Sequence, residues 1–236
     1  LFNLCLTLLL IGLFWLPVKL AQLEKFFNSP SIDVPQKVEM AQSEESAAME
    51  SPVPAADLLE TRVITINASS EKNWAYFDFS RDKVVDIMDP SSLEWDLAFR
   101  RGKIITNGGV TNKIGKAGVI DLGIQDWDTV IQAPTENYVQ DVTTRTESEN
   151  PMLLKWYKYN YLTHKLSAKN NVYALRTADG KYAKVKFLSF YCPDNENAGC
   201  IKMQYVYQDN GSPRFTKDSG EFSTTSVAAN PDNKEL

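Results

Sequence analysis

Histidine is almost absent from this sequence. His164 is the only one among 236 residues, and cysteine occurs three times. A catalytic set that pairs serine or cysteine with histidine therefore has only His164 to draw on, and no nucleophile-elbow pattern precedes that residue. An iron or zinc site that uses two imidazoles of the same chain is excluded as well. We expect a non-catalytic protein without a metal site.

Dense runs of lysine and arginine are also missing, and the formal net charge is −5. Binding to nucleic acid needs a clustered basic surface, so this class of partner is excluded. The glycines of residues 102–123 do not form a phosphate loop, because Gly115-Lys116 is not followed by serine or threonine. We interpret them as turns. EF-hand spacing is absent from the acidic residues that offer oxygen ligands, namely Asp86, Asp89, Asp121, Asp126 and Asp128.

Charge is lacking altogether from Leu1 to Val18. As a helix this run would span about 27 Å, close to the roughly 30 Å of a bilayer's hydrocarbon core. We predict a transmembrane helix with an interfacial extension over residues 1–27. A cleaved secretory signal is the alternative. The residues expected to anchor the chain in the lipid are Leu1, Leu10, Phe14 and, near the interface, Trp15.

The composition changes after this segment. Residues 28–57 are rich in Ser, Glu, Ala and Pro and poor in large apolar residues. Such a stretch buries too little surface to offset its ordering entropy, so we predict a linker, with a short helix around 39–50 as an option. Residues 58–227 form the predicted domain, and 228–236 a flexible C-terminal tail.

The domain has the pattern of an all-β fold. Runs rich in β-branched and aromatic residues recur between turn signals, and Asp179-Gly180 is typical of a hairpin turn. Short helices are expected only at 125–132 and 151–156. The predicted strands are Arg62–Ile66, Trp74–Phe79, Trp95–Phe99, Lys103–Thr106, Val172–Thr177, Tyr182–Tyr191 and Ile201–Tyr207.

Cys192 and Cys200 bracket a short loop between two of these strands. This spacing suits a cross-strand disulfide, while two free thiols or half of a metal site are the alternatives. Disulfides persist outside the cytoplasm. Lys19 and Lys25 would by themselves favour a cytoplasmic flank. We give the expected disulfide more weight than the two lysines, and predict a single-pass inner-membrane protein with its domain on the periplasmic side.

Aromatic residues gather before the last third of the chain, at Trp156, Tyr157, Tyr159 and Tyr161. In an extended segment the three tyrosines would share one face. Tyrosine combines an apolar ring with a hydrogen-bonding hydroxyl, so core packing, contact with a partner protein and stacking on a ligand all stay open.

Six motifs follow one another across the domain: WAYFDFS (Trp74–Ser80), SLEWDLAFRR (Ser92–Arg101), NGG (Asn107–Gly109), KWYKYNYLTHKL (Lys155–Leu166), VYALRTADGKYAKVKFLSFYC (Val172–Cys192) and GCIKMQYVYQDNGSPRF (Gly199–Phe215). This ordered set resembles the HmuY-like family. The resemblance implies an extracytoplasmic all-β fold, and the family's best-known members bind haem between two side chains from loops.

The iron ligands of the family do not transfer to this sequence residue by residue. His164 is a possible haem ligand, or else a histidine hydrogen-bonded within the tyrosine-rich region. Met88, Met152 and Met203 are the nearest chemical substitutes for a second ligand.

Two hypotheses follow. The main one is a non-catalytic accessory subunit without a cofactor, which contacts the lipid bilayer, other transmembrane subunits and their periplasmic domains in a respiratory or photosynthetic complex. The alternative is a haem- or porphyrin-binding protein similar to a haemophore.

Overall fold

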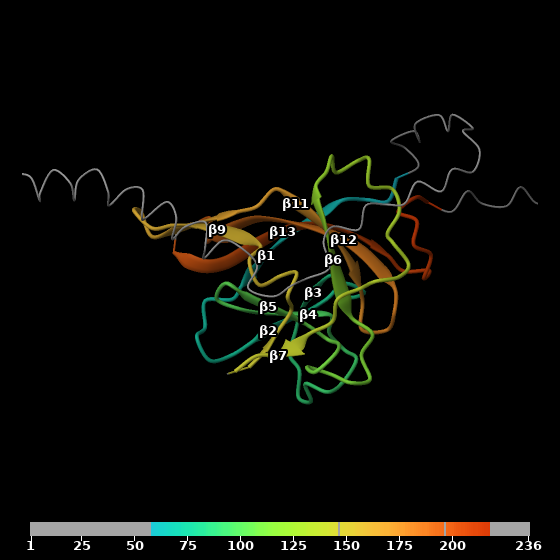
Figure 1. Ribbon diagram of the computed structural model, residues 1–236, viewed down its shortest axis with the longest axis horizontal. Coiled ribbons are helices and arrows are strands. Elements are labelled where there is room, and N and C mark those ends of the chain that lie inside the picture. The colour runs from blue at the N-terminus through green and yellow to red at the C-terminus, as the bar shows by residue number, and fades with distance from the viewer. Residues whose placement is uncertain (1–57, 146, 196, 218–236) are drawn as a thin grey trace, which may run out of the picture.

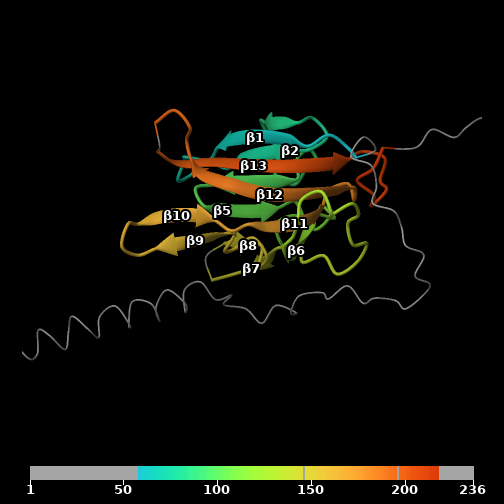
Figure 2. The same ribbon diagram turned by 90° about the horizontal axis from the view of Figure 1, so that it is seen from above.

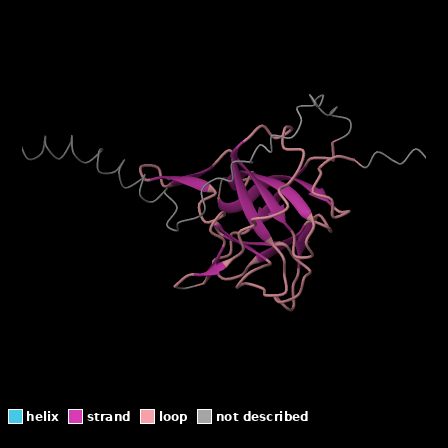
Figure 3. Cartoon of the chain, turned by 45° about the vertical axis from the view of Figure 1, so that its right-hand side comes forward, coloured by secondary structure: helices cyan, strands magenta, loops and turns pink. Residues whose placement is uncertain are grey.

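The computed structural model describes residues 58–145, 147–195 and 197–217. Over these residues the chain forms strands, turns and loops, with no helix (Figure 3). No described segment is a helix long and apolar enough to cross a bilayer. The predicted anchor (1–27), linker (28–57), helix around 39–50 and tail (228–236) lie outside the described residues.

Two antiparallel sheets make up most of the domain (Figure 1). The larger has the order β1-β13-β12-β11-β6, with β1 at Arg62–Asn67, β6 at Gly118–Ile124, β11 at Asn171–Arg176, β12 at Tyr182–Tyr191 and β13 at Ala198–Gln208. The smaller has the order β3-β2-β4-β5, with β2 at Ala75–Asp78, β3 at Lys83–Val85, β4 at Leu97–Arg100 and β5 at Lys103–Thr106. Two small hairpins complete the fold, β7 (Val142–Thr143) with β8 (Ser148–Glu149) and β9 (Tyr157–Asn160) with β10 (Lys165–Ala168).

The main core lies between the two sheets. Phe77 and Phe99 of the smaller sheet belong to the same buried cluster as Tyr173, Met203 and Tyr205 of the larger sheet. Phe77 contacts Tyr205 edge to face, with ring centroids 5.6 Å apart. The alternation of β13 explains this burial, since Met203 and Tyr205 face inward while Lys202 faces solvent.

The strand predictions are confirmed in outline. Lys103–Thr106 and Tyr182–Tyr191 have the predicted bounds, and Gly180 adopts the positive φ of 95° that a turn with glycine permits. β6 was missed, because its two glycines were interpreted as turns. It pairs with β11 and forms the edge of the larger sheet.

The two predicted helices within the described residues are wrong. At 125–132 the carbonyl groups of Trp127 and Val130 accept hydrogen bonds from the Lys184 ammonium, at 2.7 and 3.0 Å, so they are not used in a helical ladder. Lys184 is buried beneath this loop, and burial lowers its pKa to about 8. At 151–156 the chain forms successive turns that end in a fully buried Trp156.

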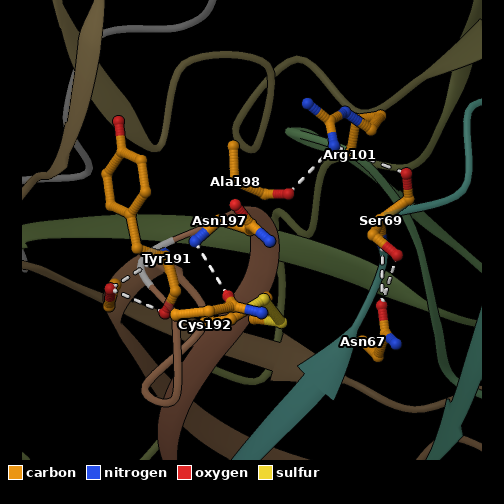
Figure 4. Close-up of a disulfide and its surroundings, with 10 residues drawn as sticks. Asn67, Ser69, Arg101, Tyr191, Cys192, Asn197 and Ala198 are labelled. Atoms are coloured by element: carbon orange, nitrogen blue, oxygen red, sulfur yellow. Dashed lines mark hydrogen bonds between the residues drawn. A yellow bond between two sulfur atoms is a disulfide. The ribbon is translucent and has the colours of Figure 1, made fainter.

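The disulfide between Cys192 and Cys200 is confirmed, with the two Cα atoms 4.7 Å apart (Figure 4). It closes the loop that joins β12 to β13, and the Cys192 N–H donates to the Asn197 carbonyl at 2.8 Å. Gly199 beside it has a φ of 110°, and a Cβ there would lie 2.7 Å from the Cα of Ser69. Only glycine fits this approach of the β13 strand to the loop after β1.

A buried carboxyl group joins the smaller sheet to the larger one. Asp96 accepts hydrogen bonds from the backbone N–H of Phe79, at 3.0 Å, and of Ala178, at 2.8 Å. Phe79 follows β2, whereas Ala178 lies in the turn between β11 and β12. Burial raises the pKa of Asp96 to about 7, against the effect of these two N–H donors.

This raised pKa predicts a pH-dependent stability. An unfolded aspartate has a pKa of about 3.9, so between pH 4 and 7 the folded state holds a proton that the unfolded state releases. The contribution of Asp96 is therefore fully present below pH 4 and falls as the pH rises to 7. We expect the free energy of unfolding of the native protein, measured relative to Asp96→Asn, to fall by roughly 4 kcal/mol over this window. If urea titrations gave the same difference in free energy of unfolding between the native protein and Asp96→Asn at every pH, the raised pKa of Asp96 would be contradicted.

The disulfide predicts a second effect on stability. Closing a loop of about nine residues reduces the entropy of the unfolded chain, and we expect Cys192→Ala combined with Cys200→Ala to lower the free energy of unfolding by about 2–3 kcal/mol. Reduction of the native protein with dithiothreitol serves as the matched control, because it breaks the same bond without a substitution. An unchanged urea midpoint in both samples would show that the bond does not stabilise the fold.

Candidate functional site

The hairpin of β9 and β10 carries several of the side chains singled out from the sequence. Tyr159 is paired with Leu166, and Tyr157 with Ala168. Near the base, Tyr157, Leu166 and Ala168 pack against the main core, and their face continues toward the tip with the half-buried Tyr159. The hairpin thus changes from a packed base to a tip exposed to solvent.

The tip is a short turn that brings His164 back onto Tyr159. The side-chain oxygen of Asn160 accepts hydrogen bonds from the N–H groups of Leu162 and Thr163, at 2.9 and 3.1 Å. His164 follows with a φ of 55°, a left-handed conformation that histidine adopts more readily than most residues. Its Nδ1 lies 2.6 Å from the hydroxyl oxygen of Tyr159.

An apolar and aromatic surface surrounds this pair. The Tyr161 ring packs edge to face against Tyr159, with centroids 4.8 Å apart. Leu162 is 83% exposed at the end of the turn. Leu162 is the exposed apolar side chain of a turn whose other exposed residues, Asn160, Thr163 and His164, are polar.

Neighbouring elements hold the hairpin in place. Figure 2 shows β9 and β10 at the same end of the domain as the loop between β12 and β13. The hydroxyl of Tyr191, next to the disulfide, accepts a hydrogen bond from the Leu166 N–H at 2.8 Å. Gly102, in the turn between β4 and β5, lies against Tyr157 and Leu166, and its carbonyl accepts from the Trp156 indole at 2.9 Å.

Trp156 requires a correction. Of the options left open for the aromatic cluster, contact with a partner is wrong for Trp156 and core packing holds, because its side chain is fully buried and packs against Phe187 and Phe190, with centroids 5.1 and 6.3 Å away. It is a core residue that fixes the start of β9. Tyr157 is largely packed too, so only Tyr159 and Tyr161 of the predicted group reach the tip.

Positive charge accumulates in this part of a chain that is acidic as a whole. Residues 155–169 contain four lysines and no aspartate or glutamate. Burial lowers the pKa of Lys169, and the charges of Lys155 and Lys158 lower it further, whereas Asp121 opposes them. Asp121 places one carboxylate beside these lysines, and the segment 155–169 itself carries positive charge only.

The methionines considered as iron ligands do not join this site. Met203 is fully buried in the main core, and Met152 packs against the same cluster. Met88 is fully exposed in the loop between β3 and β4. Within the described ranges, no group of three or more His, Cys, Asp and Glu side chains could hold a metal ion.

Two supporting residues were not found from the sequence. Tyr191 belongs to β12, and its contact with Leu166 bridges 25 positions along the chain. Arg101 donates to the Ala198 carbonyl at 2.9 Å and thereby joins the β4–β5 turn to the disulfide loop (Figure 4). The cysteine next to Tyr191 was the one available signal, because it fixed where β12 ends.

Solved structures with the same fold come from several bacteria. The apo HmuY analogue of Tannerella forsythia has 20% identity and a TM-score of 0.53, and the match covers 64% of this chain and 98% of that one. A protein of Bacteroides vulgatus described as HmuY-like and haem-binding has 23% identity and a TM-score of 0.51, with 62% and 91% covered. A protein of Bacteroides fragilis described as a lipoprotein has 20% identity and a TM-score of 0.51, with 66% and 92% covered. At such identities these likenesses show a common fold.

The comparison with family models extends this result from the fold to the family. No curated protein matches the sequence. The family model described as HmuY protein matches residues 70–205, which is more than half of the chain. The matched segment contains both sheets from β2 to most of β13, together with the β9–β10 hairpin. The chain belongs to the HmuY family.

Proposed function

We propose that this domain binds haem or a related metalloporphyrin outside the cytoplasm, at the tip of the β9–β10 hairpin. The observation that carries the proposal is the pairing of the only histidine of the sequence with Tyr159 at the exposed tip of this hairpin, next to the exposed Leu162. Membership of the HmuY family supports it, as does the fold shared with the Bacteroides vulgatus protein described as haem-binding. The disulfide supports an oxidising compartment.

The donor chemistry of the tip fits a haem. Axial ligands of haem iron are His, Cys, Met or Tyr. Cys192 and Cys200 are joined to each other, whereas the hydroxyl of Tyr159 and the imidazole of His164 lie together at the tip. Bound haem would supply an iron that accepts an axial ligand, and two carboxylates.

The surroundings of the pair also suit this ligand. Leu162 and Tyr161 offer apolar and aromatic surface to a flat macrocycle. Lys158 and Lys165 are exposed on the opposite face of the same hairpin from Tyr159, and their positive charge favours the approach of an anionic ligand. Because His164 is the only histidine of the sequence, two histidines of the same chain cannot both bind the haem iron.

Hemin titration tests the proposal. The full chain in mild detergent should shift the Soret band of hemin at a stoichiometry of one, whereas the double variant Tyr159→Phe with His164→Ala should bind at least about 100-fold more weakly, because both donors of the tip are lost. Matched controls are Tyr207→Phe, at the opposite end of β13, and Met88→Ala, in another loop. If the native protein leaves the hemin spectrum unchanged, the proposal is wrong.

The accessory-subunit hypothesis stays a prediction, since its anchor and linker lie outside the described residues. If the chain is a membrane subunit, carbonate washing should leave it in the membrane, and gentle detergent should extract it within a larger particle on a native gel. A protein that carbonate releases intact, or that migrates alone, would remove this hypothesis.

A further inference from the structure

The hydrogen bond between Tyr159 and His164 admits two arrangements around an iron. In one, the imidazole binds the metal through Nε2 while Nδ1–H donates to the phenol oxygen, as the outer hydrogen bonds of ligating histidines commonly do. In the other, the phenol donates its proton to Nδ1 and its oxygen binds the metal. Both are compatible with the 2.6 Å between Oη and Nδ1, so the choice depends on which side chain is better held and better matched to the iron.

The backbone of Tyr159 is the better supported of the two. It lies within β9, paired with Leu166, whose N–H is in turn held by the hydroxyl of Tyr191. Tyr159 is half-buried and its ring is fixed edge to face by Tyr161. His164 is exposed in the turn, with a left-handed backbone. A ligand held on a strand keeps its geometry better than one on a turn.

The chemistry of the pair points the same way. The unprotonated nitrogen of a neutral imidazole is a hydrogen-bond acceptor, and Nδ1 of His164 lies 2.6 Å from the phenol oxygen of Tyr159. With Tyr159 as the ligand, its O–H proton would pass to Nδ1 of His164, and the electron pair would stay on the phenolate oxygen, which would hold the iron. Charge balances as phenolate plus imidazolium, and no oxidant or reductant is needed.

We infer that Tyr159 binds the ferric iron of the porphyrin as a phenolate and that His164 is the positioning residue that accepts its proton. This inference rests on the proposed function and names the ligand of the same site. It also sets the class of porphyrin, because a hard anionic oxygen prefers trivalent metals to divalent ones. The site should therefore take ferric haem and Ga³⁺-protoporphyrin, and release haem when the iron is reduced.

Single variants separate the two roles. For hemin we expect Tyr159→Phe to lower affinity more than about 100-fold and to abolish the visible charge-transfer band of a phenolate bound to ferric iron. We expect His164→Ala to lower affinity only about tenfold, as loss of an outer hydrogen bond does, and to keep that band. His164→Asn, which suits the left-handed backbone and offers an amide N–H that can donate to the phenolate as the imidazolium does, should recover most of the affinity.

Circular dichroism of the apo variants, with Tyr207→Phe as the matched control, should match that of the native chain, because the changed side chains lie at an exposed tip. The inference is overturned if His164→Ala loses binding while Tyr159→Phe keeps both affinity and spectrum, since the imidazole would then be the ligand. It is also overturned if dithionite reduction leaves haem affinity unchanged. In both cases the proposed function survives. Failure of the native chain to bind hemin at all overturns the proposed function and the inference together.

Discussion

The pairing of β12 with β13 is the interaction on which the rest of the domain depends. These two long strands pair from Tyr182 with Gln208 to Tyr191 with Ala198, and β1 and β11 add to their outer edges. Their inward side chains face the smaller sheet across the main core. At the far end the disulfide closes the turn, and Tyr191 supports the β9–β10 hairpin from there. A substitution at the disulfide end of β12 and β13 should therefore also affect the position of the β9–β10 hairpin.

Buried polar groups position the loops that a sandwich of strands leaves without regular partners. Asp141 accepts hydrogen bonds from the Thr106 N–H and hydroxyl, from the Thr111 hydroxyl and from the Asn150 amide. Burial raises the pKa of Asp141, and these donors act against that shift. Asn150 then begins the turns that deliver Trp156 to the core and the chain to β9. The carboxyl group of Asp141 thus holds Asn150, at the start of the segment that leads into the β9–β10 hairpin.

Local patterns in the sequence were enough to predict the fold class and the disulfide. Alternation along β13 and the apolar runs of β5 and β12 gave the all-β class, and the cysteine spacing gave the disulfide. Tertiary contacts decided the rest. The loop around Trp127 is not helical because its carbonyl groups turn toward the buried Lys184. In β6, Tyr138 approaches Gly118 closely, whereas Gly123 has a positive φ of 73°. No local signal distinguishes such cases from the helix or the turns expected there.

The candidate site was predicted in its parts but not in its arrangement. Tyr159, Tyr161 and His164 were singled out for different reasons, and a hydrogen bond within the tyrosine-rich region was one of the two options for His164. The short turn at Asn160 unites them, because it returns the chain so that His164 meets the hydroxyl five residues earlier. The sequence left core packing and partner contact open for Trp156, since a buried and an exposed aromatic side chain look alike in an alternating run.

Amide hydrogen exchange with and without hemin is the most direct test of where the ligand binds. We expect protection concentrated in residues 157–168, with a smaller effect at Tyr191, because the hairpin would bind the macrocycle and Tyr191 supports it. Protection confined to the loops of the opposite end, or to the outer edge of β1, would contradict the assignment of the site to this hairpin.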